Sequence, residues 1–117
     1  MVRVINEKGN ISVSKEVFNN LVSVAATNCF GVKGMAMRSM SDGLVHLLKR
    51  ESMGKGVYVT YNDDGSISIE LHIIVEQGVN IAALGGSIMN EVAYKVNLAT
   101  GVDVRNVDIF IDSINLD

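Results

Sequence analysis

The chain of 117 residues contains no proline, no tryptophan and a single cysteine, Cys29. One cysteine forms no intramolecular disulfide, and even with both histidines, His46 and His72, it does not supply the four ligands of a structural zinc site. The sequence therefore predicts no disulfide framework, no metal site and no cofactor, and it suits a reducing compartment.

Long apolar runs and targeting signals are missing as well. The first eight residues include an acid, Glu7, and lack the apolar stretch of a signal peptide. The longest apolar runs are interrupted by Glu, Asn, Lys or Gly before they reach the roughly 18–20 residues that span a bilayer. We therefore expect a cytoplasmic protein that is not integral to a membrane.

Neither sign of charge dominates. Ten Lys and Arg residues stand against thirteen Asp and Glu residues, for a net charge of -3, and there is no long basic run. This balance disfavours binding to nucleic acid, which needs a basic surface. Aliphatic residues are abundant, since 48% of the residues are hydrophobic but only six are aromatic. Val, Ile, Leu and Met must therefore form the core. A chain of this length buries one core, which predicts a single domain over residues 1–117.

Caps and periodicity indicate two main helices. Ser14 is a good N-cap for a helix that runs to about residue 28, and Asn80 caps a second that runs to about residue 99. Gly101 is placed to end the second helix in a left-handed conformation. The expected core-facing residues are Val17, Leu21, Val24 and Ala25 on the first helix, and Ile81, Leu84, Ile88, Val92 and Val96 on the second.

Alternating apolar residues indicate the strands. Two short strands around a turn at residues 6–10 predict a hairpin, and residues 32–38 predict a strand after Gly31. Residues 57–61 and 67–76 predict a second hairpin, in which Ile74 alone breaks the alternation.

Two other segments depart from simple patterns. Apolar parity switches between Val104 and Val107 in the last strand, which predicts a β-bulge at Arg105–Asn106. Residues 39–56 have mixed apolar spacing, and we interpret them as a short amphipathic helix between loops. The elements together predict an α+β fold, a two-layer sandwich of one mixed β-sheet with the two main helices packed on one face.

Several segments, in order and nearly along the whole chain, resemble the alkaline shock protein family of bacterial envelope-stress proteins. They are Gly9–Ser14, Val24–Ala26, Gly31–Gly34, Lys55–Val59, Glu76–Ile81, Thr100–Val104 and Asn106–Ile109. The resemblance implies a small cytoplasmic bacterial protein with no established enzymatic activity and no catalytic residues to transfer. It implies membrane association only through a partner. The chain stops soon after the last strand and so resembles compact members that are often encoded beside a dihydroxyacetone-kinase-like fatty-acid phosphotransferase. The resemblance therefore implies this enzyme as a candidate partner, by gene neighbourhood alone.

The segment that we weight most for function is rich in methionine and leucine with basic residues beside them, a pattern that suits a flexible protein contact. A flap that covers the core is the equally weighted alternative. We call these residues the methionine-rich patch: Met35, Met37, Arg38, Met40, Leu44, Leu47, Leu48, Lys49 and Arg50.

Two adjacent glycines inside the second predicted helix, Gly85 and Gly86, each cost roughly 1 kcal/mol relative to alanine. A close contact with a partner would explain them, and a tolerated imperfection is an equal alternative. An exposed strand edge or this helix face would allow the chain to form homo-oligomers.

For each candidate catalytic or metal-binding residue a structural role is preferred. His72 with Glu70 on the polar face of the sheet suits an acid-base pair, but a solvated strand residue is favoured. Cys29 at a helix C-terminus is expected to be a core residue. The acidic residues of the sheet face are expected to be solvated. They are Glu70, Glu76, Asp103, Asp108 and Asp112.

A nucleic-acid-binding module is the alternative function. The segment Gly31–Gly34 has the form of the loop with which KH domains clamp a nucleic-acid backbone. A KH loop joins two helices, whereas the residues after Gly34 predict a strand. We therefore prefer a binding or scaffold protein that acts through protein contacts.

Overall fold

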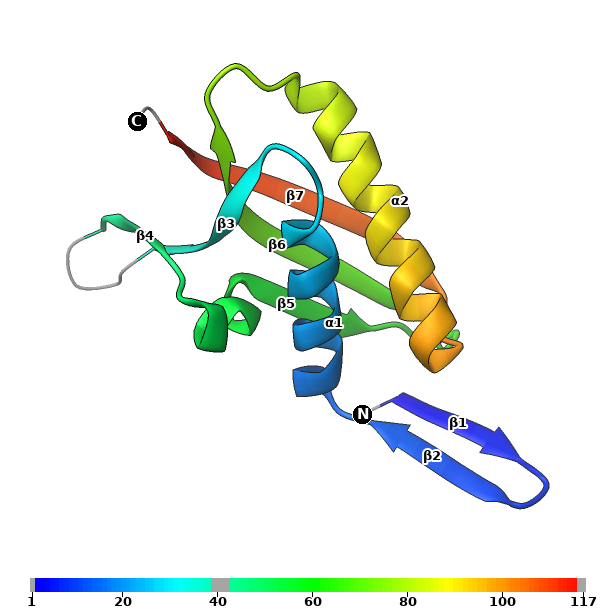
Figure 1. The fold of residues 1–117 in the computed structure, drawn as a ribbon. Helices are drawn as coiled ribbons and strands as arrows, with labels where there is room; N and C mark the ends of the chain where they lie inside the picture. The colour runs from blue at the N-terminus through cyan, green and yellow to red at the C-terminus, as the bar shows by residue number, and fades with distance from the viewer. Residues whose placement is uncertain (1, 39–42, 116–117) are drawn as a thin grey trace.

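The structure is a computed structural model that describes residues 2–38 and 43–115 (Figure 1). Its elements, in chain order, are β1 (Val2–Asn6), β2 (Gly9–Val13), α1 (Lys15–Thr27), β3 (Val32–Arg38), β4 (Val45–Leu47), the 3₁₀ helix η1 (Arg50–Gly56), β5 (Val57–Tyr61), β6 (Ile67–Glu76), α2 (Ile81–Thr100) and β7 (Val104–Asn115).

The predicted mixed sheet with two main helices on one face is confirmed. β6 is its central strand and pairs with β7 in parallel along its whole length. On its other side β6 pairs antiparallel with β5 in its first half and with β3 in its second half, and β4 extends the sheet beyond β3. The alternation of β6 places Ile67, Ile69, Leu71, Ile73 and Val75 in the core beneath the helices.

The N-terminal hairpin does not belong to this sheet. β1 and β2 pair only with each other in the described part of the chain, and they extend away from the rest of the fold (Figure 1). The expectation of one sheet is therefore wrong for these two strands. Val13, at the end of β2, is the hairpin residue that packs against the core.

α2 follows the sequence prediction closely. The Asn80 side chain accepts a hydrogen bond from the Ala83 amide at 3.0 Å, and Gly101 ends the helix with φ of 75°. Leu84, Ile88, Val92 and Val96 are buried, as expected. Ile81 is instead exposed, so its assignment to the core is wrong.

α1 has the predicted N-cap but a different buried face. Ser14 accepts a hydrogen bond from the Val17 amide at 3.4 Å. The buried residues are Phe18, Val22, Ser23, Ala25 and Ala26. The predicted stripe is therefore correct at Ala25 and in part at Leu21, which is half-buried against the core, and it is wrong at Val17 and Val24. Phe18 decides the orientation because it is the largest apolar side chain of the helix and packs edge-on against Tyr61, with ring centroids 6.3 Å apart. Burying Phe18 turns the neighbouring Val17 away from the sheet.

Residues 39–56 contain no amphipathic α-helix in their described part, which contradicts the sequence interpretation. Residues 39–42 lie outside the described residues, and the remainder forms β4 and η1. The chain stays extended here because it pairs with β3: the Leu48 amide donates to the Met35 carbonyl at 2.9 Å. At Gly56 a Cβ atom would lie 2.9 Å from the Ala36 carbonyl oxygen, which explains the glycine at this close approach.

The predicted bulge in β7 is confirmed. Val104 pairs with Ile67, but the next pair along the ladder is Asn106 with Ser68, which leaves Arg105 as the extra residue. A second shift, between the pairs of Ile73 and Ile74, adds an extra residue at Asp112 and was not predicted.

Candidate functional site

An apolar groove with a volume of about 520 Å³ lies between α1 and α2. We call it the helix groove. α1 contributes a stripe spaced by three and four residues, and α2 contributes its last turns. The lining residues are Val17, Asn20, Leu21, Val24, Ala25, Asn28, Lys95, Leu98 and Ala99.

The helix groove exists because α1 has two apolar stripes and the sheet buries one. Phe18 and Val22 occupy the buried stripe, whereas Val17 and Val24 are about half exposed. On the opposite wall Leu98 is 67% exposed, although full burial of a leucine is worth about 1.5–3 kcal/mol. Apolar side chains that are exposed along a concave surface are typical of a binding site.

Among the described residues that line the helix groove, Lys95 alone is ionisable. Its ammonium group lies 3.8 Å from Glu91 and 6.0 Å from the centre of the Tyr94 ring. The groove is therefore suited to bind an apolar surface. Its lining does not bring together the acid, base and nucleophile that a reaction requires.

The structure separates the residues of the methionine-rich patch. Met35 is fully buried in the core, so the prediction that it contacts a partner is wrong. Leu48 is half-buried and packs against the core, and Met40 lies outside the described residues. The exposed members are Met37, Arg38, Leu44, Leu47, Lys49 and Arg50.

The exposed members lie on and beside the edge strand β4. Leu47 sits over the backbone of Gly34, where a Cβ atom would come within 2.7 Å of its Cδ1. The Arg38 guanidinium donates to the Gly43 carbonyl oxygen at 2.6 Å, which ties it to the loop before β4. The segment is therefore partly a flap over the core and partly an exposed surface. That this surface binds a partner stays a prediction.

Gly85 and Gly86 lie on the outer side of α2. A Cβ atom added at either position would have no neighbour within 4 Å, beyond the helix's own backbone. Packing within the described chain therefore does not require glycine at these positions, and the partner contact proposed for them stays a prediction.

His72 is held between two carboxylates on the face of the sheet that the helices leave open. Its Nδ1 lies 3.0 Å from Asp112 Oδ2 and its Nε2 lies 3.0 Å from Glu70 Oε2. Phe110 stacks on the imidazole, with ring centroids 4.8 Å apart and an interplanar angle of 12°. Because both ring nitrogens already face carboxylates, the arrangement holds the imidazole in one orientation.

Two of the other acidic candidates, Asp103 and Glu76, have partners elsewhere. Asp103 accepts a hydrogen bond from Asn97 at 3.0 Å, and Glu76 accepts one from Asn115 at 3.1 Å. Among the described residues, no three His, Cys, Asp or Glu side chains are grouped to hold a metal ion.

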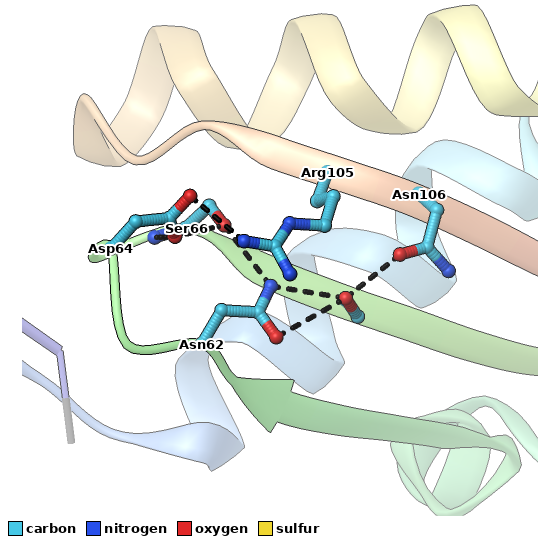
Figure 2. A network of polar contacts seen from close by, with 6 residues as sticks. Asn62, Asp64, Ser66, Arg105 and Asn106 are labelled. Carbon is cyan, nitrogen blue, oxygen red and sulfur yellow. Dashed lines mark hydrogen bonds and ion pairs between the residues drawn. The ribbon is translucent and has the colours of Figure 1, made fainter.

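A polar network locks the β5–β6 turn to the bulge of β7 (Figure 2). Asp64 Oδ1 accepts hydrogen bonds from the Ser66 hydroxyl at 2.6 Å and the Ser66 amide at 2.9 Å, and Asp64 Oδ2 lies 2.9 Å from Arg105 Nη2. The Ser66 donors, and then Arg105, hold the pKa of the Asp64 carboxyl well below its usual range. The extra residue of the bulge thus serves to anchor the start of β7.

A second branch of the network runs between the strands. Asn62 Nδ2 donates to both the Ser66 and the Ser68 hydroxyls at 3.0 Å, and the Ser68 hydroxyl donates to Asn106 Oδ1 at 2.8 Å. These contacts join β5, β6 and β7 at one end of the sheet, which is a structural role.

Cys29 and the Gly31–Gly34 segment also have structural explanations. Burial, and to a smaller extent Glu91, raises the pKa of the Cys29 thiol, which disfavours the reactive thiolate. The segment joins α1 to β3, so it lacks the two flanking helices of a KH loop. At Gly31, with φ of 102°, a Cβ atom would also lie 2.8 Å from Val79 Cγ1.

Sequence reasoning missed several exposed apolar and aromatic residues. Leu98 lies off the periodic stripe of α2, and Tyr58 and Phe110 occupy strand positions of polar parity. An apolar residue out of phase with its element was the available signal, because such a residue has no place in the element's own core.

Comparison with known proteins gives a consistent result. The model of the alkaline shock protein 23 family, described as having a cell envelope-related function, matches residues 3–116. The uncharacterised protein YloU of Bacillus subtilis (strain 168) is 32% identical over 109 residues, covering 92% of this chain and 90% of that protein. The uncharacterised protein Spy1614 of Streptococcus pyogenes serotype M6 is 30% identical over 116 residues, covering 98% and 95%.

A second uncharacterised protein of that streptococcus, Spy1535, is 26% identical over 106 residues, covering 91% of this chain and 79% of that protein. No solved structure matches the chain significantly. No helix within the described ranges is both long and apolar enough to cross a membrane.

Proposed function

The chain belongs to the alkaline shock protein family, whose function is related to the cell envelope, and from this we propose that it is a non-enzymatic protein whose helix groove binds another protein. The observation that carries the proposal is the second apolar stripe of α1. The sheet leaves this stripe, with Val17 and Val24, exposed along the groove.

The shape of the helix groove favours a protein segment as its occupant. Its α1 wall runs from Val17 to Asn28, which spans about 16 Å at the rise of an α-helix. Contacts at such three- and four-residue spacings suit an amphipathic helix laid into a groove. The phosphotransferase that the family resemblance implies is the first candidate for this partner.

A photo-crosslinking amino acid placed at Val24 tests the proposal in living cells of the source organism. We expect a crosslinked product that is larger by the mass of one protein, and Leu98→Glu should abolish it by placing a charge in the groove. Met89→Glu is the matched control, since Met89 is also an exposed apolar residue of α2 but does not line the groove. Equal crosslinking in all three proteins, or a product too small to contain a protein, would contradict the proposal.

The exposed part of the methionine-rich patch is tested in the same assay. The double variant Leu44→Asp with Leu47→Asp is expected to leave the fold intact, because both side chains are exposed. Loss of the crosslink in this variant would extend the binding surface to β4. Loss of a cooperative thermal transition would instead assign both leucines to the core.

A further inference from the structure

The face of the sheet opposite the helices carries an aromatic cluster that the helix groove does not explain. In the described part of the chain both main helices lie on the other side of the sheet (Figure 1). The Tyr58 ring is nearly perpendicular to that of His72, with centroids 5.7 Å apart, and Phe110 stacks on the imidazole. Tyr58 is 54% exposed and Phe110 is 44% exposed. Such rings present faces and edges that bind other molecules.

The aromatic rings lie in an acidic setting. Across the three strands Tyr58 pairs with Glu70, and Glu70 pairs in turn with Asp108, so two carboxylates occupy directly opposed positions. Like charges in this arrangement destabilise a sheet unless a cation lies near them. Strands β5, β6 and β7 contain four acids and a single basic residue that is always charged, Arg105, which is engaged by Asp64.

The contacts of Glu70 and of Asp112 with His72 make this surface rigid. They fix the imidazole plane, and Phe110 stacks on that plane, so the aromatic cluster is ordered before any ligand binds. A rigid aromatic surface loses little conformational entropy on binding. The Glu70 carboxylate contacts the imidazole, and Asp108 is paired with Glu70 in the strand register, so both place negative charge beside the cluster.

From this combination we infer that the open sheet face, formed by Tyr58, Glu70, His72, Asp108 and Phe110, binds an arginine-bearing segment of another protein. A guanidinium group is planar and always charged, so it stacks on an aromatic ring while it donates hydrogen bonds to a carboxylate. Nucleic acid and anionic lipid present phosphates, which this acidic face repels. The inference concerns a second surface, on the other side of the sheet from the helix groove.

Fluorescence anisotropy with a labelled eight-residue peptide of alternating arginine and serine tests the inference. The control peptide replaces each arginine with citrulline, which keeps the shape and removes the charge. We expect the arginine peptide to bind, the citrulline peptide not to bind, and a lysine peptide to bind several-fold more weakly. Equal binding of the arginine and citrulline peptides, or no binding of either, would overturn the inference.

Variants locate the site. Phe110→Leu keeps an apolar side chain in the strand but removes the ring, and we expect about fivefold weaker binding. Asp108→Asn is expected to weaken binding and to reduce its dependence on salt. Tyr94→Gln and Asp63→Asn are the matched controls, since Tyr94 is 60% exposed on α2 and Asp63 lies in the β5–β6 turn.

Circular dichroism and thermal melting confirm that each variant is folded. Controls that lose as much affinity as Phe110→Leu and Asp108→Asn would overturn the assignment, and so would binding of single-stranded RNA or anionic vesicles at this face. Leu98→Glu should bind the arginine peptide normally, because its side chain lies on the helix side. The experiments therefore test the proposed binding to the sheet face and the proposed binding to the helix groove independently.

Discussion

The two main helices pack on the same face of one sheet, yet they use their apolar residues differently. α2 buries a single stripe of four residues, from Leu84 to Val96. α1 is shorter but carries two apolar stripes, of which it buries the one that contains Phe18 and exposes the one that contains Val24. Periodicity thus locates a helix, whereas the apolar residues in excess of its buried stripe are the reason for which we propose a binding surface there.

The largest expected effect separates the two stripes of α1. Phe18→Ala should lower the free energy of unfolding by about 3–5 kcal/mol, because it leaves a cavity in the core. Val24→Ala should change it by less than about 0.5 kcal/mol, because Val24 lies at the surface. Urea denaturation measures both. Comparable losses would mean that the second stripe is structural after all.

The ends of the two helices offer the next contrast. Gly101 has φ of 75° after α2, and an alanine in a left-handed conformation costs about 1–2 kcal/mol. Asn28 ends α1 with φ of -78°, which any residue adopts, so Asn28→Ala should cost much less than Gly101→Ala. Thermal denaturation of the two variants is the measurement. An equal effect at the two ends would refute the difference in capping.

A smaller effect of opposite sign is expected inside α2. Gly86→Ala should raise the free energy of unfolding by about 0.5–1 kcal/mol, because alanine favours the helix and the added methyl group has no close neighbour. The same variant in the crosslinking assay shows whether the glycine has a function. A more stable protein that still binds its partner would identify Gly86 as a tolerated imperfection.

The smallest effect concerns the contact of Asp64 with Arg105, at the start of β7. The lowered pKa of Asp64 means that its carboxylate contributes stability above the ordinary carboxyl pKa of about 4, and that this contribution is lost as the pH falls toward the lower value in the folded state. We therefore expect Asp64→Asn to reduce the acid sensitivity of unfolding. Urea titrations at neutral pH and at about pH 3 measure this. An unchanged pH dependence would show that the network adds no net stability.

Most of the main sheet and both helix caps follow from the sequence because local rules act there without competition. Alternation along β6, the Asn80 cap and the parity switch before Val107 each predict what the structure contains. The cap depends on residues within a few positions of it. The strand features depend on the alternation that places apolar side chains on the buried face of the sheet.

The features that the sequence did not predict depend on which distant segments of the same chain pack against each other. The orientation of α1 depends on Phe18 meeting Tyr61, which lies far along the chain. The residues around β4 became a strand and a 3₁₀ helix because β3 offered an unpaired edge. The composition around Met35 predicts a binding patch, but Met35 lies in the buried part of β3, and only Met37 and Arg38 after it are exposed.

The pairing of β6 also has a consequence for the order of folding. Its antiparallel neighbour β5 is joined to it by a short turn, whose closure takes microseconds at most. Its parallel neighbour β7 pairs with it only after the chain has closed a loop that contains all of α2. Closing this loop is slow, because the chain loses entropy before the contacts between β6 and β7 compensate for the loss. In the first half of β6, the side that pairs with β7 is therefore left open during folding for longer than the side that pairs with β5. In that interval the apolar strand is most vulnerable to pairing with another chain.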